Sequence, residues 1–424
     1  MKYALVNGKI LNGHEDMEVL EGHVIYVEDG HIVQISSEVL DEYEKIDLKG
    51  QYIMPGLINM HVHLPSSGKP QKKEIDHAKL VNFVTKHRLT RMYLQKMCES
   101  SAKTQLLSGV TTIRTMGGVE NYDAMIRDRI ERGDILGPRI LAGNMAVSVP
   151  GGHMAGSLAY EARSPKEAEE YVEQIIEGKP DVVKLMITGG VLDAKKKGEP
   201  GILKMPAEYV KAACDQAHKY GYQVAAHVES PEGVKVALEN GVDTIEHGAK
   251  PDEKIIQLFK ERGASHIATL SPALPFALFD RKVSHVSEMA QYNGKIVFEG
   301  IIDCAKTCLE NDIPVGLGTD TGCPYITHYD MWRELYYFHK YCGVSNRSAL
   351  YTATKRNAEI AGIDDCIGTI DVGKEADMIV TKENPLDSLE ALRHVSMVIR
   401  KGRVIMNPQV KKMKKVEEML DKFL

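Results

Sequence analysis

Two histidines end the apolar stretch Met54-Pro55-Gly56-Leu57-Ile58-Asn59-Met60-His61-Val62-His63. Alternate residues of a strand point to the same side, so His61 and His63 are expected to face one place. Apolar strands of similar length recur along the chain and alternate with segments of helical periodicity. Eight strand candidates can be counted, at residues 53–63, 110–115, 139–142, 182–187, 223–227, 244–247, 265–270 and 314–318.

Amphipathic helical segments fill most of the gaps between these strands, for example at residues 166–177, 206–220, 252–262 and 296–311. This alternation predicts parallel strands joined by crossover helices, and eight such units predict an α/β fold closed as a (β/α)8 TIM barrel. No glycine-rich dinucleotide fingerprint or phosphate loop follows any of the strands. The sequence therefore argues against an open nucleotide-binding sheet.

The two ends of the chain are β-rich in a different way, with short strands separated by turns. Residues 3–6, 24–28 and 31–35 fit this description near the start, and residues 376–381, 396–400 and 403–406 fit it near the end. Edge strands left unpaired are a liability, so two such pieces are expected to complete one small sheet domain. Residues 411–424 follow as an amphipathic helix rich in Lys and Glu.

The composition is that of a globular protein, with 43% hydrophobic and 26% charged residues among 424. A net charge of −6 is too mild to indicate a nucleic-acid partner. No apolar run is long enough to cross a bilayer, and no signal peptide is expected at the N-terminus. Seven cysteines without a repeating spacing predict reduced thiols, and hence a cytoplasmic protein.

Polar side chains stand at the C-terminal ends of several predicted strands, where barrels of this kind carry their chemistry. Besides the two histidines of the first strand, they are Lys184, His227, His247 and Asp320. Each alone has a simpler explanation, such as a hydrogen-bonded histidine or a helix cap at Asp320. Six of them at one end of five strands predict a metal site. Imidazoles with a carboxylate suit Zn²⁺, and also Mn²⁺, Fe²⁺ or Co²⁺.

Lys184 is the unusual member of this set because it lies inside the apolar strand at residues 182–187. Desolvation lowers the pKa of an interior lysine and leaves a neutral, nucleophilic amine. Such an amine can add CO₂ to become a carbamate, an anion that can bridge two metal ions. A cationic lysine would be repelled there, so position alone suggests this modification.

Two segments resemble the signatures of a known superfamily. Residues 54–63 resemble the opening signature of the amidohydrolase superfamily, and residues 368–380 resemble its closing signature. The resemblance covers essentially the whole chain and includes the order of the polar groups at the strand ends. It implies a small discontinuous β-sandwich domain, from residues 1–54 and 366–424 with the C-terminal helix. It also implies a metal-dependent barrel over residues 55–365.

Residues 148–153 and 184–191 resemble the binuclear metal branch, whose members are prolidase-like or Zn-dependent arginine carboxypeptidase-like. This resemblance implies that His61 and His63 hold the more buried metal ion together with Asp320. His227 and His247 would hold the more exposed ion. A carboxylated Lys184 would bridge the two divalent ions, for which Zn²⁺ is the expected identity.

Members of that branch hydrolyse dipeptides or N-acyl amino acids, so the resemblance implies a hydrolase of peptide or amide carbon–nitrogen bonds. A hydroxide between the metal ions would attack the carbonyl, and Asp320 would act as general base and then general acid. Glu229 stands where the branch often has Tyr, two residues after His227, which puts the usual substrate class in doubt. His153 then becomes the candidate catalytic residue for contacting substrate or an oxyanion.

Other roles stay open. A mononuclear deaminase or cyclic-imidazolone hydrolase would place a Glu three residues after His227, where this chain has Ser230, and would lack Lys184. A lactonase or phosphotriesterase could use the same binuclear site. A non-catalytic scaffold would be expected to have lost ligands, and none is missing. The expected partner is a small-molecule substrate, and a homo-oligomer is expected because such barrels commonly assemble.

Overall fold

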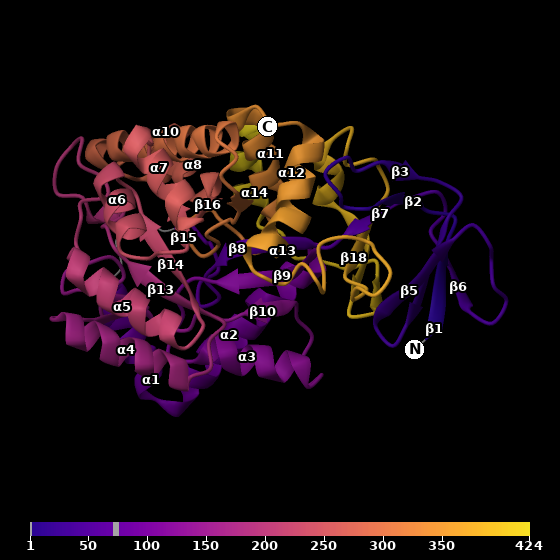
Figure 1. Cartoon of the computed structure of the whole chain (residues 1–424), viewed down its shortest axis with the longest axis horizontal. Coiled ribbons are helices and arrows are strands. Elements are labelled where there is room, and N and C mark those ends of the chain that lie inside the picture. The colour runs from indigo at the N-terminus through magenta and orange to yellow at the C-terminus, as the bar shows by residue number, and fades with distance from the viewer. Residues whose placement is uncertain (1, 71–75) are drawn as a thin grey trace. The chain divides into compact units, whose positions relative to one another are not determined.

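The computed structural model describes residues 2–70 and 76–424, and its largest element is a parallel sheet of seven strands (Figure 1). The strand order is β12 (Ala159–Glu161), β11 (Ala146–Ser148), β13 (Val182–Met186), β14 (Gln223–Val228), β15 (Thr244–His247), β16 (Ser265–Ala268) and β17 (Val315–Leu317). Every neighbouring pair in this sheet runs parallel. The parallel arrangement predicted from the alternation of strands and helices is confirmed for this part of the chain.

The first three predicted strands form a second sheet of three strands. Its order is β10 (Arg139–Leu141), β9 (Val110–Thr115) and β8 (Leu57–Val62). A parallel bridge between Val62 and Thr321 ties β8 to the segment after β17, and the His63 N–H donates to the Thr321 carbonyl at 2.9 Å. The hydrogen-bond ladders thus give two sheets joined at this edge, not one continuous closed ladder.

The strand predicted at residues 53–63 is two strands. β7 (Tyr52–Pro55) is not part of the sheet that contains β8. It pairs antiparallel with β18 (Met378–Thr381). Gly56 lies between β7 and β8, where a Cβ atom would collide with the Thr111 hydroxyl, so only glycine fits this close approach. β11 and β12 were not predicted, because three residues are too few to show a period.

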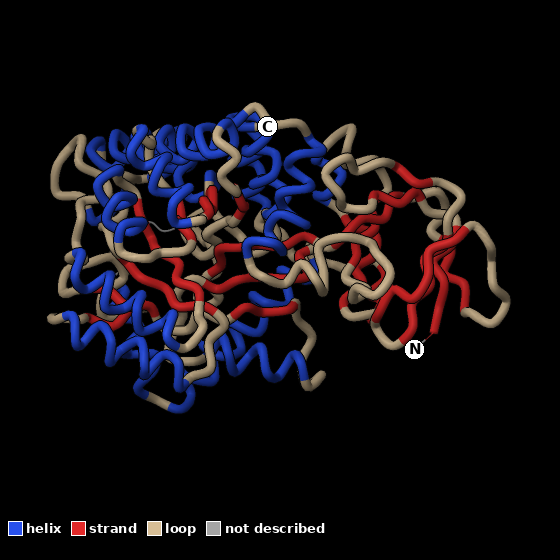
Figure 2. The backbone as a smooth tube through the Cα atoms, viewed as in Figure 1, coloured by secondary structure: helices blue, strands red, loops and turns tan. Residues whose placement is uncertain are grey.

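Helices flank the parallel strands, and several begin at a side-chain cap. Ser164, Ser230 and Asp252 each accept a backbone N–H of the helix that follows them. Figures 1 and 2 show helices on the outside of the strands in this part of the chain. The bounds are α1 (His77–Lys86), α2 (Arg88–Leu107), α3 (Tyr122–Glu131), α4 (Pro165–Glu177), α5 (Ala207–Lys219), α6 (Pro231–Glu239), α7 (Glu253–Arg262), α8 (Leu270–Leu278), α9 (Arg281–Ser284) and α10 (Glu288–Glu310).

The two ends of the chain build two further sheets. One has the order β5 (His31–Ser36), β4 (Val24–Glu28), β1 (Lys2–Val6) and β6 (Glu44–Asp47). The other has the order β20 (Arg403–Met406), β19 (Val395–Arg400), β18, β7, β2 (Lys9–Leu11) and β3 (Val19–Leu20). Strands from both ends of the chain are therefore neighbours in one six-stranded sheet.

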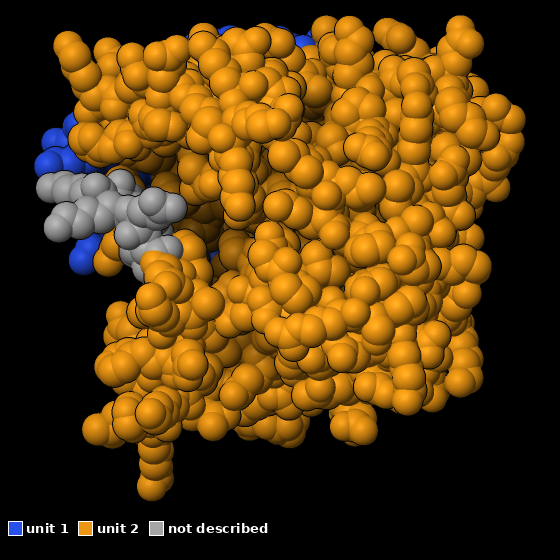
Figure 3. All heavy atoms as spheres, turned by 90° about the vertical axis from the view of Figure 1, so that its left-hand side faces the viewer, with its two compact units in different colours: residues 1–59, 102–113, 328–424 blue, residues 60–101, 114–327 orange. Residues whose placement is uncertain are grey.

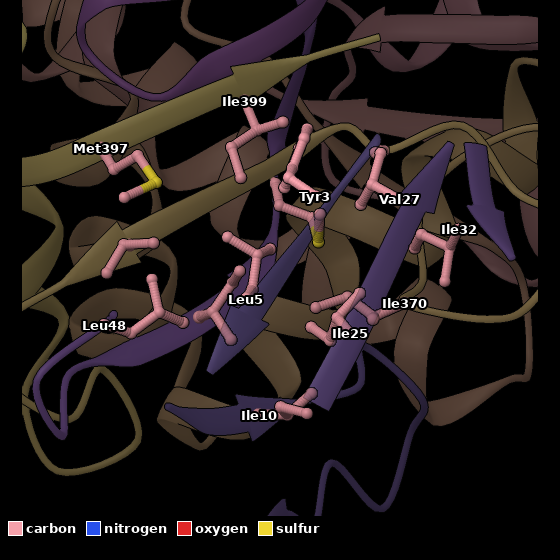
Figure 4. Packing of buried hydrophobic residues seen from close by; sticks show 14 residues of the cluster. Tyr3, Leu5, Ile10, Ile25, Val27, Ile32, Leu48, Ile370, Met397 and Ile399 are labelled. Carbon is pink, nitrogen blue, oxygen red and sulfur yellow. The ribbon is translucent and has the colours of Figure 1, made fainter. Parts of the chain in front are cut away.

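One hydrophobic cluster takes side chains from both of these sheets (Figure 4). Leu5 and Ile25 come from the four-stranded sheet, while Met397 and Ile399 come from the six-stranded sheet. All four are almost completely buried. Burial of large aliphatic side chains contributes about 1.5–3 kcal/mol each, so this cluster is a substantial source of stability.

The chain divides into two compact units (Figure 3). One comprises residues 1–59, 102–113 and 328–424, and the other comprises residues 60–101 and 114–327. The first holds the remaining α-helices, α11 (Met331–Cys342), α12 (Asn346–Tyr351), α13 (Asn357–Ile360) and α14 (Lys414–Leu420). The predicted division at residues 54 and 366 stays a prediction. Within the described residues, no helix combines the length and apolar character that a membrane span requires.

Candidate metal centre

The polar residues predicted at the strand ends surround one cavity of about 440 Å³, in the unit formed by residues 60–101 and 114–327. Figure 3 shows a hollow in the face of this unit. The residues that line the cavity include His61, His63, His153, Lys184, His227, His247 and Asp320. The structure thus brings together every site residue that the sequence analysis proposed.

Asp320 lies at the centre of this group. Its Oδ1 is 3.0 Å from His63 Nε2 and 3.6 Å from His61 Nε2. His61, His247 and Asp320 each offer one ligand atom, and these three atoms lie within 4.8 Å of one another. A nitrogen–nitrogen–oxygen set at this spacing fits a single divalent ion such as Zn²⁺.

Hydrogen bonds behind the imidazoles fix the orientation of two rings. His63 donates from Nδ1 to the Gly117 carbonyl at 2.8 Å, which directs its Nε2 toward Asp320. The Nδ1 atom of His247 is bonded to the Thr269 hydroxyl at 2.7 Å. Such outer contacts are typical of metal-ligating histidines, because they fix the tautomer and raise the basicity of the other nitrogen.

His61 is held by a buried ionic network that sequence reasoning missed. Its Nδ1 donates to Glu246 Oε2 at 2.7 Å, and Arg114 donates to Glu246 Oε1 at 2.7 Å. Thr244 donates to the same Oε1 atom, also at 2.7 Å. Burial works against the charge of Glu246, but Arg114 and His61 hold the pKa of its carboxyl below the usual range. Glu246 is therefore ionised, and its carboxylate orients the His61 ring.

The charge states around the cavity suit metal binding. Burial lowers the pKa of His61 to about 4 and holds the pKa of His227 and His247 well below the usual range. Burial opposes the charge of Asp320, yet His61 and His63 keep the pKa of its carboxyl well below its ordinary value. Neutral imidazoles and an ionised carboxylate are the forms in which these side chains bind metals. His63 differs from the other three histidines, because burial is outweighed by its contact with Asp320, which raises the pKa of His63.

The environment of Lys184 indicates that its amine needs a partner from outside the protein. It is 1% exposed, and its Nζ has no hydrogen-bond partner among the described residues. Burial lowers the pKa of this amine to about 8. A buried lysine without a partner is costly. Conversion to a carbamate between metal ions would replace it by an anion with ligands, so the residues present fit a binuclear centre.

The backbone at two of the strand ends is strained. His247 and Asp320 adopt left-handed conformations with φ of 66° and 51°. Residues other than glycine rarely do so, at a cost of roughly 1–3 kcal/mol each. The Asp320 N–H donates to the His61 carbonyl at 2.9 Å, which ties this turn to β8. Such strain gathers where function fixes the position of a side chain.

His153 belongs to the segment between β11 and β12 and contacts the site from the side. Its Nδ1 is 2.6 Å from Asp193 Oδ2, and its ring stacks on His227 with centroids 4.1 Å apart. Asp193 also accepts the Gly190 N–H at 2.8 Å, so the carboxylate is itself fixed. The sequence indicated His153, but nothing in its pattern pointed to Asp193 as the partner.

Asp193→Asn is expected to lower kcat by about 10- to 100-fold with a small change in KM, because the charge-assisted bond to His153 is lost. Metal content should stay at the wild-type value, because Asp193 lies outside the proposed ligand set. Steady-state kinetics with metal analysis would check this. Unchanged kcat, or a loss of metal equal to the loss of activity, would contradict a role in positioning His153.

A second cluster of side chains that could ligate a metal ion lies next to β15. His266, Cys304 and Cys308 offer a nitrogen and two sulfur atoms within 4.8 Å of one another. His266 Nε2 donates to the His247 carbonyl at 2.7 Å, so the cluster packs directly against the strand end that presents His247. All three side chains are buried, and all seven cysteines of the chain are free.

Comparison with known proteins identifies the class of this protein. Residues 52–405 match the amidohydrolase family, and the chain belongs to that family. Among curated relatives it is 24% identical over 392 residues to ochratoxinase from Aspergillus niger, covering 84% of this chain and 76% of that protein. It is 23% identical over 390 residues to an imidazolonepropionase from Fusobacterium nucleatum, covering 86% of each.

Solved structures give a closer match. A candidate prolidase from Bifidobacterium longum is 36% identical with a TM-score of 0.88, covering 99% of this chain and 98% of that one. A Xaa-Pro dipeptidase with methionine bound in its active site is 28% identical with a TM-score of 0.84, covering 96% and 100%. These likenesses imply an α/β TIM-barrel fold. The protein is accordingly a hydrolase of carbon–nitrogen bonds, in a family that generally uses divalent metal ions.

Proposed function

We propose that this protein cleaves the amide bond of a dipeptide or an N-acyl amino acid at a binuclear metal centre. Two divalent ions, with Zn²⁺ the best suited, would be held by His61, His63, carboxylated Lys184, His227, His247 and Asp320. The observation that carries the proposal is the buried amine of Lys184, which has no hydrogen-bond partner among the described residues and lines the same cavity as the histidines and Asp320. The likeness to a Xaa-Pro dipeptidase and to ochratoxinase supports an amide as the substrate.

The residues of this chain would share the steps of hydrolysis. When bound, divalent ions supply Lewis-acid activation of water and of the scissile carbonyl. Asp320, ionised at neutral pH, would accept the proton of the attacking water as its oxygen bonds to the carbonyl carbon. As the carbon–nitrogen bond breaks, Asp320 would pass this proton to the leaving nitrogen. His153, oriented by Asp193, would contact the substrate carbonyl oxygen.

We further propose the domain division that the sequence predicted. Residues 1–54 and 366–424 would form a small β-sandwich domain, and residues 55–365 would form the barrel. The core shared by the four- and six-stranded sheets supports the sandwich. The free cysteines support a cytoplasmic location. A homo-oligomer stays a prediction.

A cyclic-amide hydrolase is the rival, and the likeness to imidazolonepropionase favours it. Such an enzyme would need a proton shuttle at position 230, but Ser230 here caps α6 by accepting the Gly233 N–H at 3.2 Å. The cap gives Ser230 a local structural role and leaves no carboxylate at that position. We therefore rank the binuclear amide hydrolase first.

Metal analysis of protein purified without chelator tests the proposal, together with a panel of dipeptides, N-acyl amino acids and cyclic imidazolones. About two ions per chain are expected, with activity lost on chelation and recovered with Zn²⁺ and bicarbonate. About one ion per chain, with turnover of imidazolones, would favour the rival. Absence of metal and of recovery would refute a metal-dependent hydrolase.

A further inference from the structure

Glu229 is the acidic residue of the described cavity lining that the proposed metal ligands leave unused. It directly follows β14, where its backbone N–H donates to the Thr188 hydroxyl at 3.1 Å. The Val191 N–H donates to its carboxyl group. Its Oε2 is buried and has no hydrogen-bond partner among the described residues. A buried carboxyl group with so little compensation calls for a partner from outside the chain.

The charged side chains that line the cavity indicate whether the ligand group that pairs with Glu229 is positive or negative. Among the described lining residues there is no arginine, and the one lysine is Lys184, which the proposed centre occupies. A substrate carboxylate would thus find no free side-chain cation there. The charged side chains of the described structure that act on Glu229 are the carboxylates of Asp320 and Asp193, so no side-chain cation neutralises it. This combination favours a positively charged group of the substrate.

The rest of the wall is apolar. Side chains from α1, α2, α8, α10 and the segment after β13 line it, among them Val84, Leu94, Met97, Val191, Phe276 and Ile301. Apolar walls with few polar groups bind the hydrophobic part of a ligand and leave orientation to those polar groups. The cavity therefore suits an apolar side chain next to a cation.

The position of Glu229 indicates which cationic group of the substrate it would bind. It is two residues from His227 and interacts electrostatically with Asp320, so it lies beside the proposed reaction centre. In an aminoacyl amide, the α-ammonium group is two bonds from the scissile carbonyl carbon. A cation in the acyl half is therefore close enough to reach Glu229 while the carbonyl is at the metal centre.

We propose that Glu229 is a specificity-determining residue that binds the α-ammonium group of the substrate. The substrates are then dipeptides or aminoacyl amides with a free amine and an apolar side chain, not amides with a blocked amine. This inference rests on the proposed amide hydrolysis at the same site. It goes beyond that proposal by excluding N-acyl amino acids as preferred substrates.

The test compares two substrates that differ only in the amine, leucine anilide and 4-methylpentanoic anilide. The wild-type enzyme should favour leucine anilide in kcat/KM by about 10- to 100-fold, the range of a charged hydrogen bond. Glu229→Gln should bring this ratio to within about threefold of one. Glu232→Gln, an exposed matched change on α6, should keep the wild-type ratio.

A wild-type ratio near one, or a ratio unaffected by Glu229→Gln, would overturn the role of Glu229. Calorimetric binding of leucinol and of 4-methylpentan-1-ol separates this from failure of hydrolysis. If neither anilide is cleaved, tighter binding of leucinol that Glu229→Gln abolishes would uphold the amine site and reject only the amidase activity. Equal binding of the two alcohols would reject the amine site.

Discussion

Asp320→Asn is expected to lower kcat by about 100- to 10,000-fold while the metal content stays at the wild-type value. Asparagine keeps the shape and one carbonyl oxygen of the side chain, so a ligand atom remains. It cannot accept a proton from water at neutral pH. His61 and His63 hold Asp320 ionised in the wild-type protein, which is the state that proton transfer requires. Single-turnover kinetics with metal analysis would measure the effect.

The matched control is Asp215→Asn, because Asp215 is exposed on α5 and pairs only with Lys211 in the described structure. This control should keep wild-type kcat and metal content. A kcat of Asp320→Asn close to that of the control would remove Asp320 from proton transfer. If Asp320→Asn lost metal in proportion to activity, Asp320 would act only as a metal ligand and not in proton transfer.

The strand pattern was readable from the sequence because parallel strands buried on both faces are nearly continuous apolar runs. Val182–Met186, which is apolar except for Lys184, lies within the strand predicted at residues 182–187. The stretch at residues 53–63 was read as one strand because its apolar run continues through Gly56. Only the pairing of β7 with β18, hundreds of residues away in sequence, separates it into two.

The residues of the candidate metal centre could be predicted for a related reason. Barrel chemistry gathers at the carboxyl ends of the strands, so His61, Lys184 and Asp320 could be placed together without coordinates. Arg114 and Glu246 could not, because a charged residue inside a strand gives no sign of its partner. Their ion pair is 2.7 Å long between β9 and β15 and becomes visible only in three dimensions.

Lys184→Ala is expected to reduce the metal content from about two ions per chain to about one or fewer, with a loss of kcat/KM on the order of 1,000-fold. The wild-type amine is buried and lacks a partner in the described structure, so a neutral amine is available to attack CO₂. The new nitrogen–carbon bond forms with release of one proton. The resulting carbamate would supply the anionic oxygen ligands that alanine cannot.

A carbamate and a free amine at position 184 can be distinguished by the small molecule that restores activity to Lys184→Ala. In Lys184→Ala the removed side chain leaves space that a short carboxylate such as propionate could fill. Propionate should therefore restore part of the activity and of the metal content, whereas propylamine should not. Lys211→Ala, an exposed control on α5, should match the wild-type enzyme without either additive.

Rescue by propylamine in place of propionate would show that Lys184 acts as an amine. Wild-type activity and two bound metal ions in Lys184→Ala would show that it has no part in the centre. Native mass spectrometry gives an independent answer, because a carboxylated lysine adds the mass of CO₂ to the wild-type chain and not to the variant. Acidification should remove this added mass, since a carbamate loses CO₂ once its nitrogen is protonated. If the wild-type enzyme holds two metal ions but its mass lacks the CO₂ increment, Lys184 is not carboxylated. The proposed role of Lys184 would then be wrong, and water or Asp320 would have to ligate both ions.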